Sequence, residues 1–158
     1  MKYDISAATL IDYPNIDRIQ SNAFATPWSK ELIRSAILNG KYDVRVMKVK
    51  HKPVAGFYIA HVTNGRSNLD NLAVDLHLRG MGMGRKLLED WIERACLQKT
   101  ATLSLQVNTK NKGAQRLYQC FAFKKVRLLS GYYPNGDDAY QMEMPIKQQQ
   151  VTAKARQA

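Results

Sequence analysis

The sequence predicts one mixed α/β domain, for three reasons. The chain has 158 residues, which is the size of a single domain. With 45% apolar and 9% aromatic residues, its composition excludes a disordered chain. Segments with a hydrophobic period near 3.6 residues, typical of helices, are interleaved with segments whose period of two is typical of strands. The expected order of elements is β-α-α-β-β-β-α-β-α-β-β.

The first half of the chain is expected to form one strand, two helices and three consecutive strands. Ser29 precedes the second helix as a candidate N-cap. Asn64-Gly65 is the expected turn between the last two strands. The expected ranges are 3–8, 11–24, 30–38, 44–49, 54–62 and 69–74.

The second half alternates helices and strands. Residues 87–96 carry apolar side chains at helical spacing and charged side chains on the opposite face, which predicts an amphipathic helix. Apolar and polar residues alternate over 102–107, which predicts a strand. A short helix over 114–121 and strands over 123–133 and 139–144 complete the order, with a turn at Pro134-Asn135-Gly136-Asp137.

The cysteines and histidines give no sign of a disulfide framework or a metal site. Cys96 and Cys120 fall in apolar helical patterns and are interpreted as small core residues. The three histidines share no metal-like spacing, so they are interpreted as surface or strand residues and no metal is expected. The chain shows no signal-peptide region and no apolar run of about 20 residues, so we expect a cytoplasmic protein without membrane contact.

The net charge is unusual. There are 24 Lys and Arg residues against 13 Asp and Glu residues, which gives +11 and favours an anionic partner such as RNA or a ribosome, with a basic solvated surface as the alternative. Three of the basic residues lie in 147–158, a Gln-, Lys- and Ala-rich segment that is expected to be a disordered tail. The remaining 1–146 is expected to be the folded domain, and it is still strongly basic.

A glycine-rich segment joins the strand over 69–74 to the amphipathic helix. Gly80, Gly82 and Gly84 lie within five residues, and Arg79 and Arg85 flank them. Without Cβ atoms the backbone can turn tightly and approach a ligand closely. The helix N-terminus directs unpaired N–H groups and the positive end of its dipole outward. A strand, a glycine loop and a helix N-terminus in this order are suited to binding phosphates.

The spacing of this loop matches neither a Walker loop nor a dinucleotide fingerprint. Arg79-x-x-Gly82-x-Gly84 resembles the [Gln/Arg]-x-x-Gly-x-[Gly/Ala] pyrophosphate loop of the GNAT N-acetyltransferases. A second segment resembles the Asn…Ala…Leu-Tyr…Gly-Phe pattern of that family, with Asn111, Ala114, Leu117-Tyr118 and Phe121-Ala122-Phe123. Ala122 replaces the usual glycine. The resemblance covers residues 3–144 and implies a GNAT-like fold, with a central mixed, mostly antiparallel sheet flanked by helices.

The resemblance implies a co-substrate and roles for individual residues. Acetyl-CoA is expected to be held through its acetyl and pantetheine part by the backbone of Leu72, Ala73 and Val74, with Asn111 also in contact. Tyr118 is the family's proton donor to the departing thiolate, although a packed helix aromatic would fit the same position. The expected pyrophosphate contacts are Arg79, Gly80, Met81, Gly82, Met83, Gly84 and Arg85.

Two further segments narrow the resemblance. Pro27-Trp28-Ser29, and Tyr132-Tyr133-Pro134 with the following 138–142, resemble the ribosomal-protein-alanine N-acetyltransferase branch. Members of that branch acetylate the N-terminal α-amine of a protein. Trp28, Tyr132 and Tyr133 would then wall the substrate groove, and ordinary strand aromatics are the alternative for the two tyrosines.

Gln106 departs from the pattern of that branch, which has a glutamate general base at this position. A glutamine amide cannot accept a proton at neutral pH, although it can hydrogen-bond a water or the amine. Three interpretations stay open. Another group such as Asp70 acts as the base; or no strong base is needed; or the chain belongs to another GNAT branch or is impaired.

Three functions therefore remain in view. The first is acetyl transfer from acetyl-CoA to a protein N-terminus. The second is acetyl transfer to a small amine, namely an amino acid, a polyamine or a drug. The third is a non-catalytic GNAT-like domain that binds RNA or a ribosome through its charge. The basic body does not suit a highly basic substrate tail, because like charges slow encounter.

Overall fold

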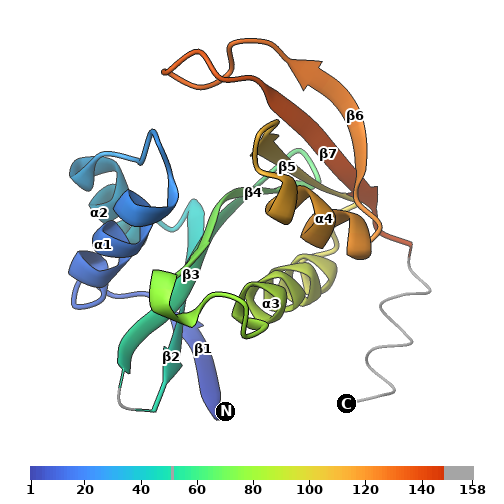
Figure 1. Ribbon diagram of the computed structural model, residues 1–158. Helices are drawn as coiled ribbons and strands as arrows, with labels where there is room; N and C mark the ends of the chain where they lie inside the picture. Colours follow the sequence, from blue (N-terminus) through green and yellow to red (C-terminus); the bar gives the residue numbers. More distant parts are fainter. Residues whose placement is uncertain (51, 148–158) are drawn as a thin grey trace. The chain divides into compact units, whose positions relative to one another are not determined.

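The computed structural model describes residues 1–50 and 52–147 (Figure 1). The chain divides into two compact units, of which unit 1 contains residues 1–61 and 70–91 and unit 2 contains 62–69 and the described residues from 92 onward. The strands of the described chain form a seven-stranded sheet in the order β1-β2-β3-β4-β5-β7-β6. The expected order of helices and strands is confirmed, with a 3₁₀ turn, η1 (Leu76–Leu78), added after β4.

Unit 1 begins with β1 (Tyr3–Ala7), α1 (Tyr13–Ala23), α2 (Lys30–Leu38), β2 (Tyr42–Val49) and β3 (Lys52–Thr63). Helix α1 begins two residues later than expected because Pro14 occupies its first turn, where a missing N–H costs nothing. The predicted cap of α2 is confirmed, since the Ser29 side chain accepts a hydrogen bond of 3.2 Å from the Leu32 amide. Strands β1, β2 and β3 pair in antiparallel order.

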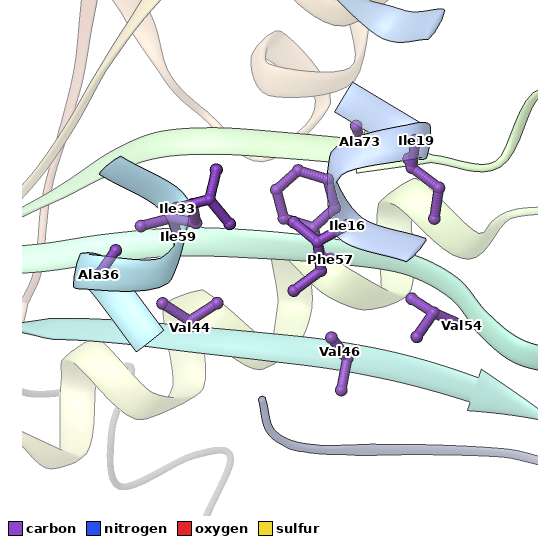
Figure 2. Packing of buried hydrophobic residues seen from close by; sticks show 10 residues of the cluster. All are labelled: Ile16, Ile19, Ile33, Ala36, Val44, Val46, Val54, Phe57, Ile59 and Ala73. Atoms are coloured by element: carbon purple, nitrogen blue, oxygen red, sulfur yellow. The ribbon is translucent and has the colours of Figure 1, made fainter. Parts of the chain in front are cut away.

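The core of unit 1 lies where α1 and α2 cover one face of the strands (Figure 2). On each helix, buried residues three positions apart face the sheet, and residues at alternate positions of β2 and β3 face the helices. The apolar side chains of the helices and strands therefore pack together in one layer. The buried residues of this cluster are Ile16, Ile19, Ile33, Ala36, Val44, Val46, Val54, Phe57, Ile59 and Ala73.

Gly56 marks a close approach inside unit 1. A Cβ atom built on Gly56 would lie 2.9 Å from the Ala73 carbonyl oxygen and 2.9 Å from Leu87 Cδ1. The absence of a side chain at this position therefore lets the first turns of α3 (Met83–Leu97) pack against β3 and the end of β4 (Arg66–Val74).

Unit 2 contains β5 (Thr102–Asn108), α4 (Lys112–Cys120), β6 (Lys124–Leu129) and β7 (Ala139–Pro145). Strand β5 pairs with β4 in parallel and with β7 in antiparallel order, and β6 pairs with β7. The sheet is mostly antiparallel, as expected. Leu103, Leu105 and Val107 of β5 are buried, as their alternation predicts.

Three features differ from expectation or fall outside it. The strand expected over 123–133 ends at Leu129, because Gly131 adopts a left-handed φ of 60° and its amide donates to the Asp138 side chain, which starts a loop. Cys120 is exposed at the last position of α4 and Cys96 is partly buried, so Cys120 is not a core residue. The expected basic tail lies outside the described residues except for Lys147, and the boundary at 146 stays a prediction.

The described residues include no helix that combines the length and the apolar character required to span a membrane.

Candidate functional site

The glycine loop in unit 1 has the backbone conformation that its sequence predicts. Gly80 and Gly82 adopt left-handed φ angles of 75° and 81°. A Cβ atom at either position would have no atom within 4 Å, so open space faces these glycines and the requirement for glycine is conformational. Helix α3 follows directly, and its first backbone hydrogen bond runs from the Lys86 amide to the Gly82 carbonyl oxygen at 3.2 Å.

The amides of Met83 and Gly84 precede this first bond, so they have no acceptor within the helix. They lie at the positive end of the α3 dipole. Arg85 adds positive charge on the same turn, where it pairs with Glu89 at 3.4 Å. This arrangement can bind an anion, and phosphate is among the anions that such N-termini bind.

Asp75 holds the segment between β4 and the loop. Its side chain accepts a hydrogen bond of 3.0 Å from the His77 amide, and it forms an ion pair of 2.8 Å with Arg18. Burial opposes the ionisation of Asp75, but the His77 amide and the Arg18 guanidinium outweigh it and hold the pKa of that carboxyl below its usual value. Arg79 Nε donates to the Val74 carbonyl oxygen at 3.2 Å, so the arginine at the start of the loop folds back onto β4.

The end of β4 is the segment expected to hold an acetyl and pantetheine group. The ladder between β4 and β5 runs from the pair Arg66–Thr102 to the pair Leu69–Leu105. Strand β4 continues to Val74, five residues beyond the last pair in this ladder. The Leu72–Val74 backbone is therefore not engaged in this ladder.

Asp70 is the first residue of the part of β4 that extends beyond the ladder with β5. Its Oδ2 atom is 2.6 Å from Nδ1 of His61 on β3. The His61 ring also makes an edge contact with the ring of Tyr42, its partner in the β2–β3 register, with ring centroids 5.8 Å apart. Trp28 makes a similar edge contact with Tyr42 at 6.1 Å. Trp28, Tyr42, His61 and Asp70 thus form a continuous row of side chains in unit 1, which we call the aromatic row.

The backbone of Trp28 is fixed by a buried glutamine. Gln20 donates through Nε2 to the Trp28 carbonyl oxygen at 2.7 Å and accepts from the Trp28 amide at 3.0 Å. Gln20 is fully buried on α1, so this reciprocal pair replaces water for both partners. The position of the predicted groove residue Trp28 is therefore determined by α1.

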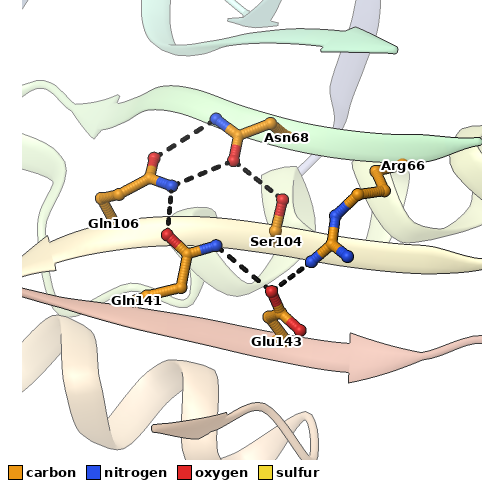
Figure 3. A network of polar contacts seen from close by, with 6 residues as sticks. All are labelled: Arg66, Asn68, Ser104, Gln106, Gln141 and Glu143. Atoms are coloured by element: carbon orange, nitrogen blue, oxygen red, sulfur yellow. Dashed lines mark hydrogen bonds and ion pairs between the residues drawn. The ribbon is translucent and has the colours of Figure 1, made fainter. Parts of the chain in front are cut away.

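Gln106 lies in a network of polar side chains in unit 2 (Figure 3). Its Nε2 donates to Gln141 Oε1 at 2.7 Å and to Asn68 Oδ1 at 3.3 Å, and its Oε1 accepts from Asn68 Nδ2 at 3.3 Å. Ser104 donates to the same Asn68 oxygen at 2.9 Å. These contacts occupy both ends of the Gln106 amide, so its orientation is set by the two strands next to β5.

The network ends in a carboxylate. Gln141 Nε2 donates to Glu143 Oε1 at 3.3 Å, and the same oxygen is ion-paired with Arg66. Neighbouring positions on β4, β5 and β7 supply all of these residues, because every second side chain lies on the same face of a strand. The carboxylate of this network is therefore that of Glu143, which is linked to Gln106 through Gln141.

Tyr118 lies on α4 with its ring packed edge-on against Phe123 at 6.1 Å. Only 8% of the residue is exposed. Burial, with a smaller contribution from Tyr133, raises the pKa of Tyr118 well above its ordinary value. Among the described residues its hydroxyl has no hydrogen-bond partner. Tyr118 thus carries its proton throughout the neutral range and can act as a donor.

Tyr132 and Tyr133 lie in the loop after β6, with ring centroids 5.0 Å apart. Burial raises the pKa of Tyr133 to about 12, with Tyr132 and Asp137 adding to the shift. Asp137 ties this loop to the end of β5, since it accepts from Asn108 Nδ2 at 2.8 Å and from Lys110 Nζ at 2.7 Å. The Lys110 hydrogen bond is the main cause that holds the pKa of Asp137 below its usual value.

Asn111 serves as the N-cap of α4. Its Oδ1 accepts from the Ala114 amide at 3.1 Å, while its Nδ2 makes no hydrogen bond to any described residue. The buried Gln115 donates to the carbonyl oxygens of Asn108 and Thr109 and fixes the turn from β5 into α4. The capping contact gives Asn111 a structural role beside the predicted contact with a ligand.

Within each unit the structure gathers several of the predicted residues. Unit 1 contains Asp70, the end of β4, the loop and Trp28, and unit 2 contains Gln106, Asn111, Tyr118 and the two tyrosines. Sequence reasoning missed the pairing of His61 with Asp70. It also missed Asn68, Gln115, Gln141 and Asp137. Polar residues at every second position of 66–68, 104–106 and 141–143 were the available signal for the network. No group of three His, Cys, Asp or Glu side chains in the described part of the chain could hold a metal ion.

Comparisons with known proteins agree with these features. The family description "Acetyltransferase (GNAT) domain" matches residues 12–146. The chain is 32% identical over 145 residues to a [ribosomal protein bS18]-alanine N-acetyltransferase of Escherichia coli, covering 90% of this chain and 97% of that protein. The crystal structure of the Escherichia coli ribosomal-protein-S18-alanine N-acetyltransferase superposes with a TM-score of 0.84 over 92% of this chain and 95% of that one, again at 32% identity.

A more distant neighbour shares the fold alone. Arabidopsis thaliana NAA60, solved in complex with acetyl-CoA, gives a TM-score of 0.85 at 17% identity and covers 92% of this chain and 99% of that one. The family match spans most of the sequence, and it includes both the left-handed glycine loop and the β5–α4 segment with Tyr118. On this evidence the chain belongs to the GNAT acetyltransferase family.

Proposed function

We propose that this protein transfers the acetyl group of acetyl-CoA to the N-terminal α-amine of a protein. The observation that carries the proposal is the left-handed Gly80–Gly82 turn leading into the open N-terminus of α3, in a chain of the GNAT family. The Escherichia coli relative is by name an alanine N-acetyltransferase of ribosomal protein bS18. We propose the same class of substrate, a protein N-terminus, for this chain.

The loop fits the diphosphate of acetyl-CoA. The Met83 and Gly84 amides, the helix dipole and the side chains of Arg79 and Arg85 all favour negative charge at this position. Because a Cβ at Gly80 or Gly82 would meet no neighbouring atom, a ligand has room to approach the backbone. The Leu72–Val74 backbone would hold the acetyl and pantetheine part, and Asn111 Nδ2 is available for a further contact.

The state of Gln106 favours an α-amine as the acceptor. A neutral amine is needed for attack, and the bound amide of Gln106 cannot accept its proton. An α-amine with a pKa near 8 is roughly 10% neutral at pH 7, whereas a lysine near 10.4 is roughly 0.04% neutral. A site without the family glutamate thus serves an α-amine far better than a lysine.

In the acetyl transfer, the departing CoA thiolate must acquire one proton. The amine nitrogen attacks the thioester carbonyl carbon, a C–N bond forms and the C–S bond breaks. Backbone N–H groups at the end of β4 would stabilise the negative charge that develops on the carbonyl oxygen. Tyr118, protonated because burial raises its pKa, would supply the proton that the CoA sulfur acquires.

The net charge of +11 constrains the acceptor. A basic protein slows its own encounter with a highly basic peptide, so we expect an acidic substrate, or one presented on RNA, to be acetylated faster. Contact with RNA or a ribosome stays a prediction from this charge.

The test is a CoA-release assay on matched amines. One peptide has a free α-amine and no lysine, a second has a blocked N-terminus and one lysine, and a polyamine and a free amino acid complete the panel. We expect release with the first peptide alone. Release with the small amines alone would replace the proposed substrate. No heat of binding at high micromolar acetyl-CoA would overturn the proposed activity itself.

A further inference from the structure

The aromatic row ends in a hydrogen-bonded histidine–carboxylate pair whose chemistry the proposed function does not yet use. We propose that His61 is the general base of the acetyl transfer and that Asp70 is its positioning residue. The inference deepens the proposed function and rests on it. It assigns the proton acceptor to a residue on β3, whereas Gln106 occupies the family's position on β5.

The geometry of the pair determines which ring nitrogen is available. His61 Nδ1 lies 2.6 Å from Asp70 Oδ2, so the Nδ1 proton is donated to the carboxylate. Nε2 then bears the lone pair and can accept a proton. The carboxylate also stabilises the imidazolium that results, as a buried carboxylate does for the histidine of a hydrolase triad. The His61 side chain is 26% exposed and that of Asp70 14%, so the ring can be reached while its partner is shielded.

The position of the pair places it near the expected acetyl group. Asp70 precedes Leu72 by two residues on β4, a separation of about 7 Å along a strand. All groups proposed to bind the acetyl, pantetheine and diphosphate parts in unit 1 follow Asp70 within fifteen residues. Trp28 and Tyr42 extend the row from His61 as a wall of aromatic rings, so an N-terminal peptide lying along them would end at the imidazole.

The proton balance of the step is complete without another reagent. His61 Nε2 takes one proton from the bound ammonium group, which leaves a neutral amine. The amine nitrogen then forms the C–N bond as the C–S bond breaks. The nitrogen loses its second proton to solvent as the amide forms, and the CoA sulfur gains a proton from Tyr118. The imidazolium then releases its proton to solvent and Tyr118 regains one from solvent, so the net reaction releases one proton.

The neutral fraction of the acceptor amine determines how much activity should be lost when His61 is replaced. Without a base, the enzyme uses the neutral fraction of an α-amine, roughly 10% at pH 7 and nearly all of it at pH 9.5. Loss of His61 should therefore lower kcat/KM up to about tenfold at pH 7 and have little effect at pH 9.5. The titratable groups that contact the His61 ring from the described strands are the Asp70 carboxylate on β4 and the Tyr42 phenol on β2. A purely structural role of His61 would lower activity equally at both pH values.

The test compares His61→Gln and His61→Ala with wild type and with His77→Gln. His77 is exposed on η1, so its substitution controls for the loss of a histidine outside the site. CoA release from an α-amine peptide is measured at pH 7 and pH 9.5, and acetyl-CoA affinity is measured by calorimetry for each variant. We expect both His61 variants to bind acetyl-CoA normally, to lose about tenfold at pH 7, and to approach wild type at pH 9.5.

Two further measurements separate positioning from folding. Free imidazole should restore turnover to His61→Ala at pH 7 by occupying the vacated space beside Asp70. Asp70→Asn removes the charge that stabilises the imidazolium, so it should show the same pH-dependent loss with an unchanged affinity for acetyl-CoA. Activity of the His61 variants equal to wild type at pH 7, or an equal loss at both pH values without rescue by imidazole, would overturn the inference. An inactive wild-type enzyme would instead overturn the proposed function.

Discussion

Gln106→Glu restores the residue type that the related branch carries, and the polar network makes its outcome specific. Gln106 Nε2 donates to the oxygens of Gln141 and Asn68. A carboxylate oxygen at this position would face both acceptors. Asn68 gains nothing by rotating its amide, because its Nδ2 already donates to the other side-chain oxygen at position 106 and rotation would remove that bond. Gln141 cannot rotate freely, because its Nε2 already donates to Glu143.

The expected loss of stability follows from the hydrogen bond that the substitution removes. Either the 2.7 Å bond between Gln106 and Gln141 disappears, or Gln141 rotates and turns its oxygen toward the Glu143 carboxylate. Breaking one partner of a part-buried pair costs about 1–3 kcal/mol. For a chain of this length each kcal/mol lowers Tm by about 2–4 °C. We expect Tm of Gln106→Glu to fall by roughly 2–12 °C at pH 7.5, with no gain in turnover.

The destabilisation caused by Gln106→Glu should depend on pH. The neighbouring oxygens raise the pKa of the introduced carboxyl in the folded state above its unfolded value, so the charged form destabilises the protein at high pH. Below about pH 4.3 the carboxyl is protonated in both states and the penalty vanishes. Tm of Gln106→Glu should therefore approach that of wild type at pH 4.

The assay is thermal denaturation at pH 7.5 and pH 4, with CoA release measured in parallel. Gln98→Glu is the matched control, because Gln98 is exposed and should change stability by less than about 0.5 kcal/mol. A Tm for Gln106→Glu equal to that of Gln98→Glu at pH 7.5 would show that the network does not hold Gln106. A rise in turnover would show that the position serves as a base site that this chain leaves unfilled.

Gly82→Ala should weaken acetyl-CoA binding about fivefold in calorimetry, because a residue with a Cβ leaves the left-handed φ in the free loop and regaining it on binding costs about 1 kcal/mol. Gly65→Ala has the same backbone strain in the β3–β4 turn and should leave that affinity unchanged; equal affinities for the two variants would contradict the role of the loop. Tyr118→Phe should lower kcat about 10²-fold at an unchanged acetyl-CoA dissociation constant, and an unaltered kcat in stopped-flow assays would exclude it as the donor. Asp75→Ala should lower Tm at pH 7, because its depressed pKa makes the ionised form stabilising; the difference from wild type should narrow as the pH falls below 3.8, and a constant difference would refute that linkage.

Local signals in the sequence determined the elements and the loop. Ser29 caps α2, and Asn64-Gly65 turns with φ angles of 51° and 71°, because capping and turn geometry depend on residues a few positions apart. The glycine loop could also be predicted from local sequence, since the left-handed φ angles of Gly80 and Gly82 require only the backbone freedom of these two residues. The order of elements followed from hydrophobic period alone. The end of β6 was misplaced because apolar and aromatic residues continue past Leu129, while the Gly131–Asp138 contact that ends it joins residues seven apart.

Only the tertiary structure decided which polar side chains meet. His61 and Asp70 are nine residues apart, and Gln106 reaches Asn68 and Gln141 across 38 and 35 residues. Such pairs depend on strand register, and a shift of one residue would turn each side chain to the opposite face. The sequence by itself determined a GNAT-type loop and an expected donor at Tyr118. It left the base open, because a proton acceptor is defined by the hydrogen bond that orients it, and that bond forms only when two strands are placed side by side.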